Sequence, residues 1–290
     1  MISPMISYVT WNRMGLTVRN LSALLSGSED FELFIIDNNS QDDTWAFINS
    51  LEDRRIKNRI RFNVNRGHVY ATNYNLSLRK KEQFFITVDN DVNIHSPQWI
   101  TQFVRAFEEF PEMGLLGAVP QQYYNNYRLT YLRKERNGVS CLETTKGFVE
   151  GCCQCIRPEV FDVLGYWNEE NCLGDLEICY RIRHFTPYKV GFLPSIEIDQ
   201  MQQIPCSGCN AFEMCSLNKP VKTCFSMQDR KNLNSGFKDS YSFRYKEYIK
   251  ETTNGKVKAY CPSIHDPESM EKGSYSMQKA QKNFSLYAEL

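Results

Sequence analysis

The most constraining feature of this 290-residue chain is the run Phe-Phe-Ile-Thr-Val-Asp-Asn-Asp at residues 84–91. Its apolar and β-branched residues predict a buried strand, and the two carboxylates that follow, Asp89 and Asp91, would be costly inside such a strand. We therefore expect them at the carboxyl edge of a sheet, in the crevice where α/β proteins bind ligands. A solvated turn also suits so short a motif, since Asp and Asn favour turns.

The spacing of the two carboxylates indicates what they bind. In extended backbone, Asp89 and Asp91 point the same way, so both can face one cation or one polar ligand. One or two carboxylates, completed by the phosphates of a substrate, are typical ligands of Mg²⁺ or Mn²⁺. The pair therefore predicts a divalent cation site that serves a phosphorylated substrate.

Short apolar strands alternate with helical patterns through about the first 120 residues. This β-α-β-α order predicts an α/β fold, with a mostly parallel, Rossmann-like sheet flanked by helices. Polar clusters follow several strands, at the edge where a binding crevice is expected. The expected strands are 6–9, 31–36, 59–63, 84–88 and 114–119, and the expected helices are 16–25, 44–51, 70–76 and 99–110.

Composition narrows the class of protein. The chain has 34 Lys or Arg against 34 Asp or Glu, so no net charge draws it toward nucleic acid or anionic lipid. No apolar run is long enough for a membrane span, and the N-terminus has the pattern of a strand and not of a secretion signal. Eleven cysteines in such a chain indicate reduced thiols or a metal site. We therefore expect a cytoplasmic protein without a membrane span.

Two common phosphate-binding loops are missing from the sequence. No Gly-x-Gly-x-x-Gly follows the first strand, which disfavours a dinucleotide fold, and no Gly-x-x-x-x-Gly-Lys-Ser/Thr is present. A nucleotide site without a glycine cradle remains, in which a metal carries the phosphates.

Five motifs in chain order resemble those of the nucleotide-sugar glycosyltransferases of family 2, which are inverting enzymes with the GT-A fold. The resemblance covers about two-thirds of the chain. Its motifs are Thr10-Trp11-Asn12-Arg13, the segment Phe-Ile-Ile-Asp-Asn-Asn-Ser-Gln-Asp-Asp-Thr at 34–44, Asn65-Arg66-Gly67 with Ala71 and Asn73, Asp89-Asn90-Asp91, and Gly174-Asp175-Leu176-Glu177-Ile178-Cys179-Tyr180-Arg181.

The resemblance implies a role for each matched position. Asp37, at the end of the second strand, would hold the nucleoside, although a turn or helix cap would explain it too. Asp91 would bind the cation between the two phosphates, and Asp89 would contact the ribose, the cation or its water shell. The other positions implied to bind the nucleotide donor are Thr10, Asn12, Arg13, Asn65, Gly67 and Asn90.

Asp175 matches the position of the general base in this family. An inverting transfer needs such a base to take the proton from the attacking hydroxyl. Asp175 precedes a predicted helix, whose dipole favours the ionised carboxylate, and a plain helix cap is the alternative role. The sequence departs from the family in having Gly174 where Glu is usual and Glu177 where a second Asp is usual. Assistance from Glu177 or Glu150 therefore stays open.

A further protein ligand to the cation is expected after the next strand. Many relatives have a histidine there, and in this chain the strand predicted at 190–198 is followed by Asp199. A carboxylate oxygen suits Mg²⁺ or Mn²⁺. Asp199 is therefore the predicted replacement, with His265 as the alternative.

Residues 201–290 leave the family pattern and carry more basic than acidic residues. Their C-x2-C-x5-C-x8-C array suits four thiolates around a structural Zn²⁺, with free thiols or disulfides as alternatives. We divide the chain into a catalytic domain at 1–200, with a nucleotide-binding half at 1–92 and an acceptor and base half at 93–200, and a cysteine-rich extension at 201–290. The four predicted zinc ligands are Cys206, Cys209, Cys215 and Cys224.

The sequence thus predicts a metal-dependent inverting glycosyltransferase that moves a sugar from a nucleoside diphosphate sugar, expected to be UDP-linked, to an acceptor hydroxyl. The acceptor is open between a glycan, a lipid carrier, a peptide and another hydroxyl compound, and nucleic acid is disfavoured by the neutral charge. A catalytically silent GT-A domain that binds carbohydrate or protein is the main alternative. A nucleotidyltransferase is a second alternative. It would require a Gly-rich, basic loop after the first strand, and this chain lacks such a loop.

Overall fold

The computed structural model describes residues 2–124, 130–200 and 235–288. Within these ranges one nine-stranded sheet runs in the order β3-β2-β1-β4-β9-β6-β10-β8-β7, and β11 and β5 form a separate pair. The strands are β1 (Met5–Thr10), β2 (Glu32–Asp37), β3 (Ile56–Arg61), β4 (Phe85–Asp89), β5 (Val92–Ile94), β6 (Met113–Gly117), β7 (Tyr131–Arg136), β8 (Val139–Thr144), β9 (Cys153–Ile156), β10 (Lys189–Phe192) and β11 (Ile198–Gln200).

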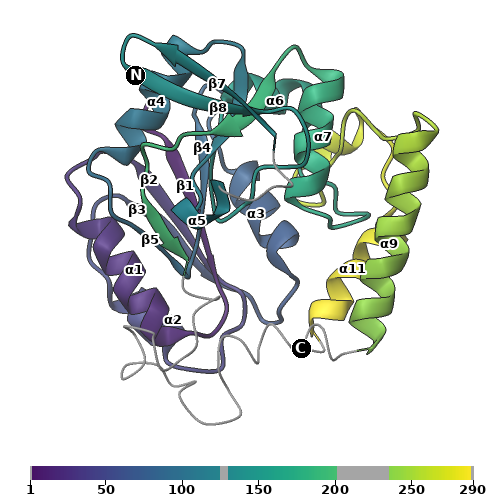
Figure 1. The fold of residues 1–290 in the computed structure, drawn as a ribbon. Helices are drawn as coiled ribbons and strands as arrows, with labels where there is room; N and C mark the ends of the chain where they lie inside the picture. The colour runs from purple at the N-terminus through teal and green to yellow at the C-terminus, as the bar shows by residue number, and fades with distance from the viewer. Residues whose placement is uncertain (1, 125–129, 201–234, 289–290) are drawn as a thin grey trace.

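Helices lie on both sides of this sheet, with α1, α2 and α4 on one side in Figure 1 and α3, α7, α9 and α11 on the other. The expected α/β class, a largely parallel sheet flanked by helices, is confirmed. The helices are α1 (Met14–Ser26), α2 (Thr44–Ser50), α3 (His68–Ser77), α4 (Trp99–Glu109), α5 (Gln121–Tyr124), α6 (Pro158–Leu164), α7 (Asp175–Phe185), α9 (Ser235–Thr253), α10 (Pro267–Met270) and α11 (Met277–Ala288).

The register of the parallel strands brings the polar motifs to one edge. Thr10 at the end of β1 pairs with Asp37 at the end of β2, and Val9 pairs with Asp89 at the end of β4. All six residues of β1 are buried, so this strand forms the centre of the core between its two neighbours. Motifs that lie about 80 residues apart in the chain therefore meet at a single crevice.

The sheet differs from the expectation in its strand directions and in one predicted strand. The short strand β9 runs antiparallel between β4 and β6, and β8 runs antiparallel to both β10 and β7, so the sheet is mixed. The strand predicted at 190–198 is wrong, because β10 ends at Phe192 and β11 begins at Ile198 in the other sheet, paired with β5. Pro194 lies between them and lacks the amide proton that a continuing central strand would need.

A buried carboxylate ties the C-terminal segment to the sheet domain. Glu169 is fully buried, and its carboxylate accepts hydrogen bonds from Asn73 Nδ2 at 2.8 Å, Ser263 Oγ at 2.6 Å, the amide of Ile264 at 3.1 Å and the hydroxyl of Tyr275. Because donors from α3 and from residues 263–275 converge on it, these parts of the chain pack as one unit.

Several predictions for the C-terminal region stay untested. Cys206, Cys209, Cys215 and Cys224 lie outside the described residues, so the zinc array and the boundary after residue 200 remain predictions. The seven cysteines of the described ranges are all buried free thiols. In the same ranges, no helix combines the length and apolar character needed to cross a membrane.

The network around Glu169 predicts a large stability effect. Replacing Glu169 with Ala leaves several buried donors without an acceptor, so we expect the free energy of unfolding in urea to fall by about 3–4 kcal/mol. Glu108→Ala, which removes an exposed glutamate from α4, is the control and should change it by less than about 0.5 kcal/mol. Equal effects of the two substitutions would contradict the role of this carboxylate.

Candidate active site

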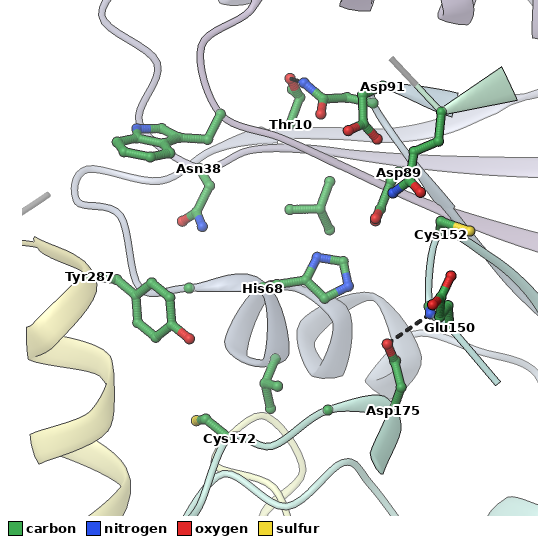
Figure 2. Close-up of a pocket in the computed structure, with 18 of the residues that line it drawn as sticks. Thr10, Asn38, His68, Asp89, Asp91, Glu150, Cys152, Cys172, Asp175 and Tyr287 are labelled. Carbon is green, nitrogen blue, oxygen red and sulfur yellow. Dashed lines mark hydrogen bonds between the residues drawn. The ribbon is translucent and has the colours of Figure 1, made fainter. Parts of the chain in front are cut away.

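A cavity of about 650 Å³ lies at the carboxyl ends of β1 and β4. Figure 2 shows Asp89, Asp91, Glu150 and Asp175 on one side of this cavity and Asn38 and Tyr287 on the other. The cavity brings together eight of the residues that the sequence predicts for the site, namely Thr10, Arg13, Asn65, Gly67, Asp89, Asn90, Asp91 and Asp175.

The Asp-Asn-Asp step is a turn and not an extended segment. Asp89 ends β4, Asn90 and Asp91 form the turn, and β5 starts at the next residue. The side chain of Asn90 donates to Thr10 Oγ1 at 2.9 Å, and its carbonyl accepts from Asn20 Nδ2 at 2.9 Å. The asparagine between the carboxylates thus fixes the turn to β1 and α1, and both carboxylates line the cavity although the backbone is not extended.

Asp91 is buried and forms an ion pair with Arg13. The distance from Arg13 Nη1 to Asp91 Oδ2 is 3.3 Å, and the aspartate side chain is 2% exposed. Arg13 has the left-handed φ of 64°, an uncommon conformation for arginine, directly before α1. The pairing places a positive charge beside a buried carboxylate and so offsets part of the cost of its burial.

The acidic pair suits a cation that arrives with a phosphorylated substrate. No group of three or more His, Cys, Asp or Glu side chains that would hold a metal ion occurs within residues 2–124, 130–200 and 235–288. Two carboxylates match the usual coordination of Mg²⁺, which retains several water ligands and takes substrate phosphates as further ligands. Asp89 and Asp91 therefore fit a cation of this kind, with phosphate oxygens completing its shell.

Asp37 and Asn12 are not among the residues that line the cavity. Asp37 is fully buried and accepts hydrogen bonds from the amide at 3.0 Å and the hydroxyl of Ser40, and Arg61 Nε lies 3.4 Å from its other oxygen. Burial raises the pKa of Asp37, and the bonds from Ser40 oppose this. Asn12 Oδ1 accepts from the amide of Gln41 at 2.8 Å. Both side chains therefore hold the loop after β2. For Asp37 this is the alternative role in a turn that the sequence also allowed.

Asn38 lines the cavity where the sequence analysis expected Asp37. Its Nδ2 donates to Asn65 Oδ1 at 2.8 Å, its Oδ1 accepts from the amide of Arg66 at 3.1 Å, and its own amide donates to the carbonyl of Thr10 at 2.8 Å. Asn38 thus joins three of the predicted motifs. The sequence signals for it are its place directly after a buried strand and its place in the motif at 34–44.

Asp175 is the first residue of α7 and points toward Gly151. Its Oδ2 accepts a hydrogen bond from the Gly151 amide at 2.7 Å, and a Cβ at position 151 would collide with its carboxyl oxygens. The loss of surrounding water raises the pKa of Asp175 to about 7, the Gly151 bond lowers it, and the nearby Glu150 raises it further. A carboxyl with this pKa exchanges protons near neutral pH, as a general base must.

Glu177 does not assist Asp175. It is buried and forms an ion pair with Arg181 at 2.6 Å, one turn along the same helix. It is absent from the residues that line the cavity, whereas Glu150 is among them. Of the two candidates that the sequence left open, the structure brings Glu150 to the site.

Asp199 and His265 do not reach the cavity. The Asp199 carboxylate lies 2.7 Å from His95 Nε2, and both side chains are exposed. Its neighbour Gln200 lines the cavity instead, because successive side chains of β11 point to opposite sides. His265 Nε2 lies 3.1 Å from the carbonyl of Tyr70, and burial lowers its pKa to about 4. We therefore assign His265 a packing role.

Comparison with known proteins agrees with this geometry. Residues 5–165 match the family described as Glycosyl transferase family 2. The chain belongs to this family. Protein CgeD of Bacillus subtilis is 25% identical to it over 225 residues, which are 71% of this chain and 51% of that protein. The predicted family is confirmed, and the chain spans about half the length of this curated relative.

Solved structures of glycosyltransferases share the fold. The mannosyltransferase PcManGT from Pyrobaculum calidifontis, in complex with GDP-Man and Mn²⁺, aligns over 79% of this chain and 65% of its own with a TM-score of 0.57 and 16% identity. GalNAc-T7 with UDP, GalNAc and Mn²⁺ aligns over 68% of this chain and 43% of its own, with a TM-score of 0.51 and 13% identity. At these identities the likeness shows the GT-A fold alone.

The raised pKa of Asp175 predicts how stability of this family 2 protein depends on pH. Asp175 ionises near pH 4 in the unfolded chain and at about 7 in the folded chain, so stability is lost as the pH rises between these values. Asp175→Asn keeps an oxygen for Gly151 and cannot ionise. We expect it to exceed the wild type in free energy of unfolding by about 2 kcal/mol at pH 8 and by less than about 0.5 kcal/mol at pH 4.

Urea denaturation at both pH values measures this difference. Asp162→Asn, a change at an exposed aspartate of α6, is the matched control and should show no pH-dependent gain. A gain for Asp175→Asn of the same size at pH 4 and pH 8 would mean that the carboxyl is not perturbed.

Proposed function

We propose that this protein is a metal-dependent inverting glycosyltransferase that moves a sugar from a nucleoside diphosphate sugar to an acceptor hydroxyl. The observation that carries the proposal is that one cavity holds the Asp89 and Asp91 pair together with Asp175, whose pKa is raised to about 7. Two proteins of the same fold were solved with Mn²⁺, one with GDP-Man and one with UDP and GalNAc, which supports a donor of this class.

The acidic pair would hold the cation and, through it, the donor diphosphate. A bound Mn²⁺ or Mg²⁺ offsets the negative charge that develops on the departing nucleoside diphosphate. Asp91 is the stronger candidate ligand, because it is buried at the cavity and already faces a positive charge from Arg13. Arg13 lines the same part of the cavity, and its guanidinium would bind phosphate oxygens of the donor.

The nucleoside would lie on the other side of the same crevice. Thr10, Asn38 and Asn65 are buried polar side chains that line the cavity at the ends of β1 and β2 and after β3. The Asn38–Asn65 bond fixes the orientation of both amides, so their remaining groups are held in place for a base or ribose. A UDP-linked sugar is the donor that we propose.

Asp175 would act as the general base of the transfer. Its ionised carboxylate accepts the proton of the acceptor hydroxyl while the hydroxyl oxygen attacks the anomeric carbon from the face opposite the diphosphate. The Gly151 amide holds the carboxylate through Oδ2, and the Asp175 side chain lines the cavity. A single base on one face of the sugar corresponds to inversion at the anomeric carbon.

Nucleotide release from a panel of donors tests the proposal. We expect the wild type to release nucleotide from at least one UDP-, GDP- or dTDP-sugar in the presence of Mn²⁺ or Mg²⁺, and Asp91→Ala to lower the rate at least about 100-fold. Asp162→Ala, at the exposed aspartate of α6, should leave the rate unchanged. No release from any donor, with Asp91→Ala equal to wild type, favours a silent sugar- or protein-binding domain instead.

The pH profile of the reaction tests the base. We expect kcat to rise with pH through a midpoint at about 7, because Asp175 must be ionised to accept the proton. Glu150→Gln should shift this midpoint to lower pH, since Glu150 raises the pKa of Asp175. Asp175→Asn should lower kcat by about 100- to 10,000-fold, and a flat profile in the wild type would assign the base elsewhere.

A further inference from the structure

One wall of the cavity comes from far outside the family motifs. Tyr287, on the C-terminal helix α11, lines the cavity although the family match ends at residue 165. Its ring lies on the backbone of Gly67, where an added Cβ would come within 2.6 Å of two ring carbons. Gly67 has a φ of +85°, so this position requires glycine for conformation as well as for space.

The helix that carries Tyr287 is firmly held. Ala280 and Phe284 of α11 are buried in the core, and the Phe284 ring packs edge-on against Tyr70 with centroids 4.8 Å apart. Asn283 Nδ2 donates to the carbonyl of Glu169 at 3.0 Å. The packing of α11 against the core therefore fixes the position of the Tyr287 ring in the cavity.

Tyr287 faces the loop that leads to Asp175. Figure 2 shows its ring across the cavity from Asp89 and Asp91, on the same side as Cys172. Burial raises the pKa of the Tyr287 hydroxyl, and the neighbouring Cys172 and Arg244 also act on it, so it stays protonated. Arg244 in turn donates to the carbonyl of Asn171 at 2.6 Å. The ring thus lies between Gly67 and Cys172, in the segment that leads to Asp175, and away from the carboxylate pair.

Further aromatic side chains continue from Tyr287 onto α9. The ring of Phe237 packs edge-on against Tyr287 with centroids 5.2 Å apart. Tyr241 follows one turn later on the same face of α9 and is 45% exposed. These three residues, which we call the aromatic wall, extend from Tyr287 in the cavity lining to the exposed Tyr241 on α9.

We infer that the aromatic wall is the acceptor subsite and that it binds a sugar ring. This inference rests on the proposed function, and it makes the acceptor a carbohydrate. Aromatic rings present flat apolar faces that match the C–H face of a pyranose, and the tyrosine hydroxyls provide hydrogen bonds for its hydroxyl groups. Asp89 and Asp91 are assigned to the donor diphosphate and Asn38 and Asn65 to the nucleoside. The part of the lining formed by Tyr287 and residues 172–174, which lead to Asp175, is left for the acceptor.

Saturation-transfer NMR tests this subsite without requiring turnover. The probes are the methyl glycosides of glucose, galactose, mannose and N-acetylglucosamine, each added to the full chain with Mg²⁺ and either UDP or GDP. We expect saturation transfer to the ring C–H protons of at least one glycoside. Tyr287→Ala should reduce this transfer at least five-fold, and Tyr287→Phe, which keeps the ring, should retain at least half of it.

Phe243→Ala is the matched control, because Phe243 is an aromatic residue of α9 that is 63% exposed and lies on a different face of that helix from Phe237 and Tyr241. It should leave the transfer unchanged. Circular dichroism melting of each variant verifies that the fold is kept, and Leu replaces Ala at position 287 if the alanine variant does not fold. Tyr287→Leu should likewise reduce the saturation transfer to the glycoside at least five-fold.

Three outcomes would overturn the inference. The first is the absence of saturation transfer to every glycoside, and the second is saturation transfer that persists in Tyr287→Ala. The third is a loss of UDP or GDP affinity in Tyr287→Ala, measured by calorimetry, which would place the ring in the donor site. Nucleotide release by the wild type is measured separately. Release without glycoside binding refutes the subsite alone, and glycoside binding without release refutes the proposed transfer.

Discussion

The structure depends on the buried carboxylate of Glu169. A carboxylate without contact to water is tolerated only where hydrogen-bond donors surround it. The donors to Glu169 come from two separate parts of the chain, α3 and residues 263–275. The same residue holds α11 through the bond from Asn283 to its carbonyl. Since α3 begins at the cavity and α11 carries Tyr287 into it, this one group aligns two walls of the site.

The site itself is divided by charge and by exposure to water. At one end, the buried Asp91 forms an ion pair with Arg13 at 3.3 Å. At the other end, Asp175 has lost most of its contact with water and keeps a single backbone donor, so its pKa is raised. In the function that we propose, the first carboxylate holds a cation and the second takes a proton. Because the two side chains are chemically identical, these proposed roles differ only through their environments.

Local patterns predicted much of the fold, and the exceptions have identifiable causes. The strand that ends at Asp89 is specified by its own apolar residues, and α4 by its helical spacing. The strand expected at 190–198 was wrong because a proline interrupts it and because pairing with β5 was not visible locally. That pairing turns Asp199 outward to His95 and Gln200 inward, a choice that depends on register and not on residue type.

The sequence by itself determined the family, the alternation of strands and helices through about the first 120 residues, and the presence of the carboxylates at strand ends, because these depend on residues close together in the chain. Only the tertiary structure decided which polar side chain enters the cavity. It placed Asn38 there and Asp37 behind it, since parallel register joins β1 to β2 at that point. It also brought Tyr287 onto Gly67 across more than 200 residues. Contacts of that span arise from packing of the whole chain, and no local pattern encodes them.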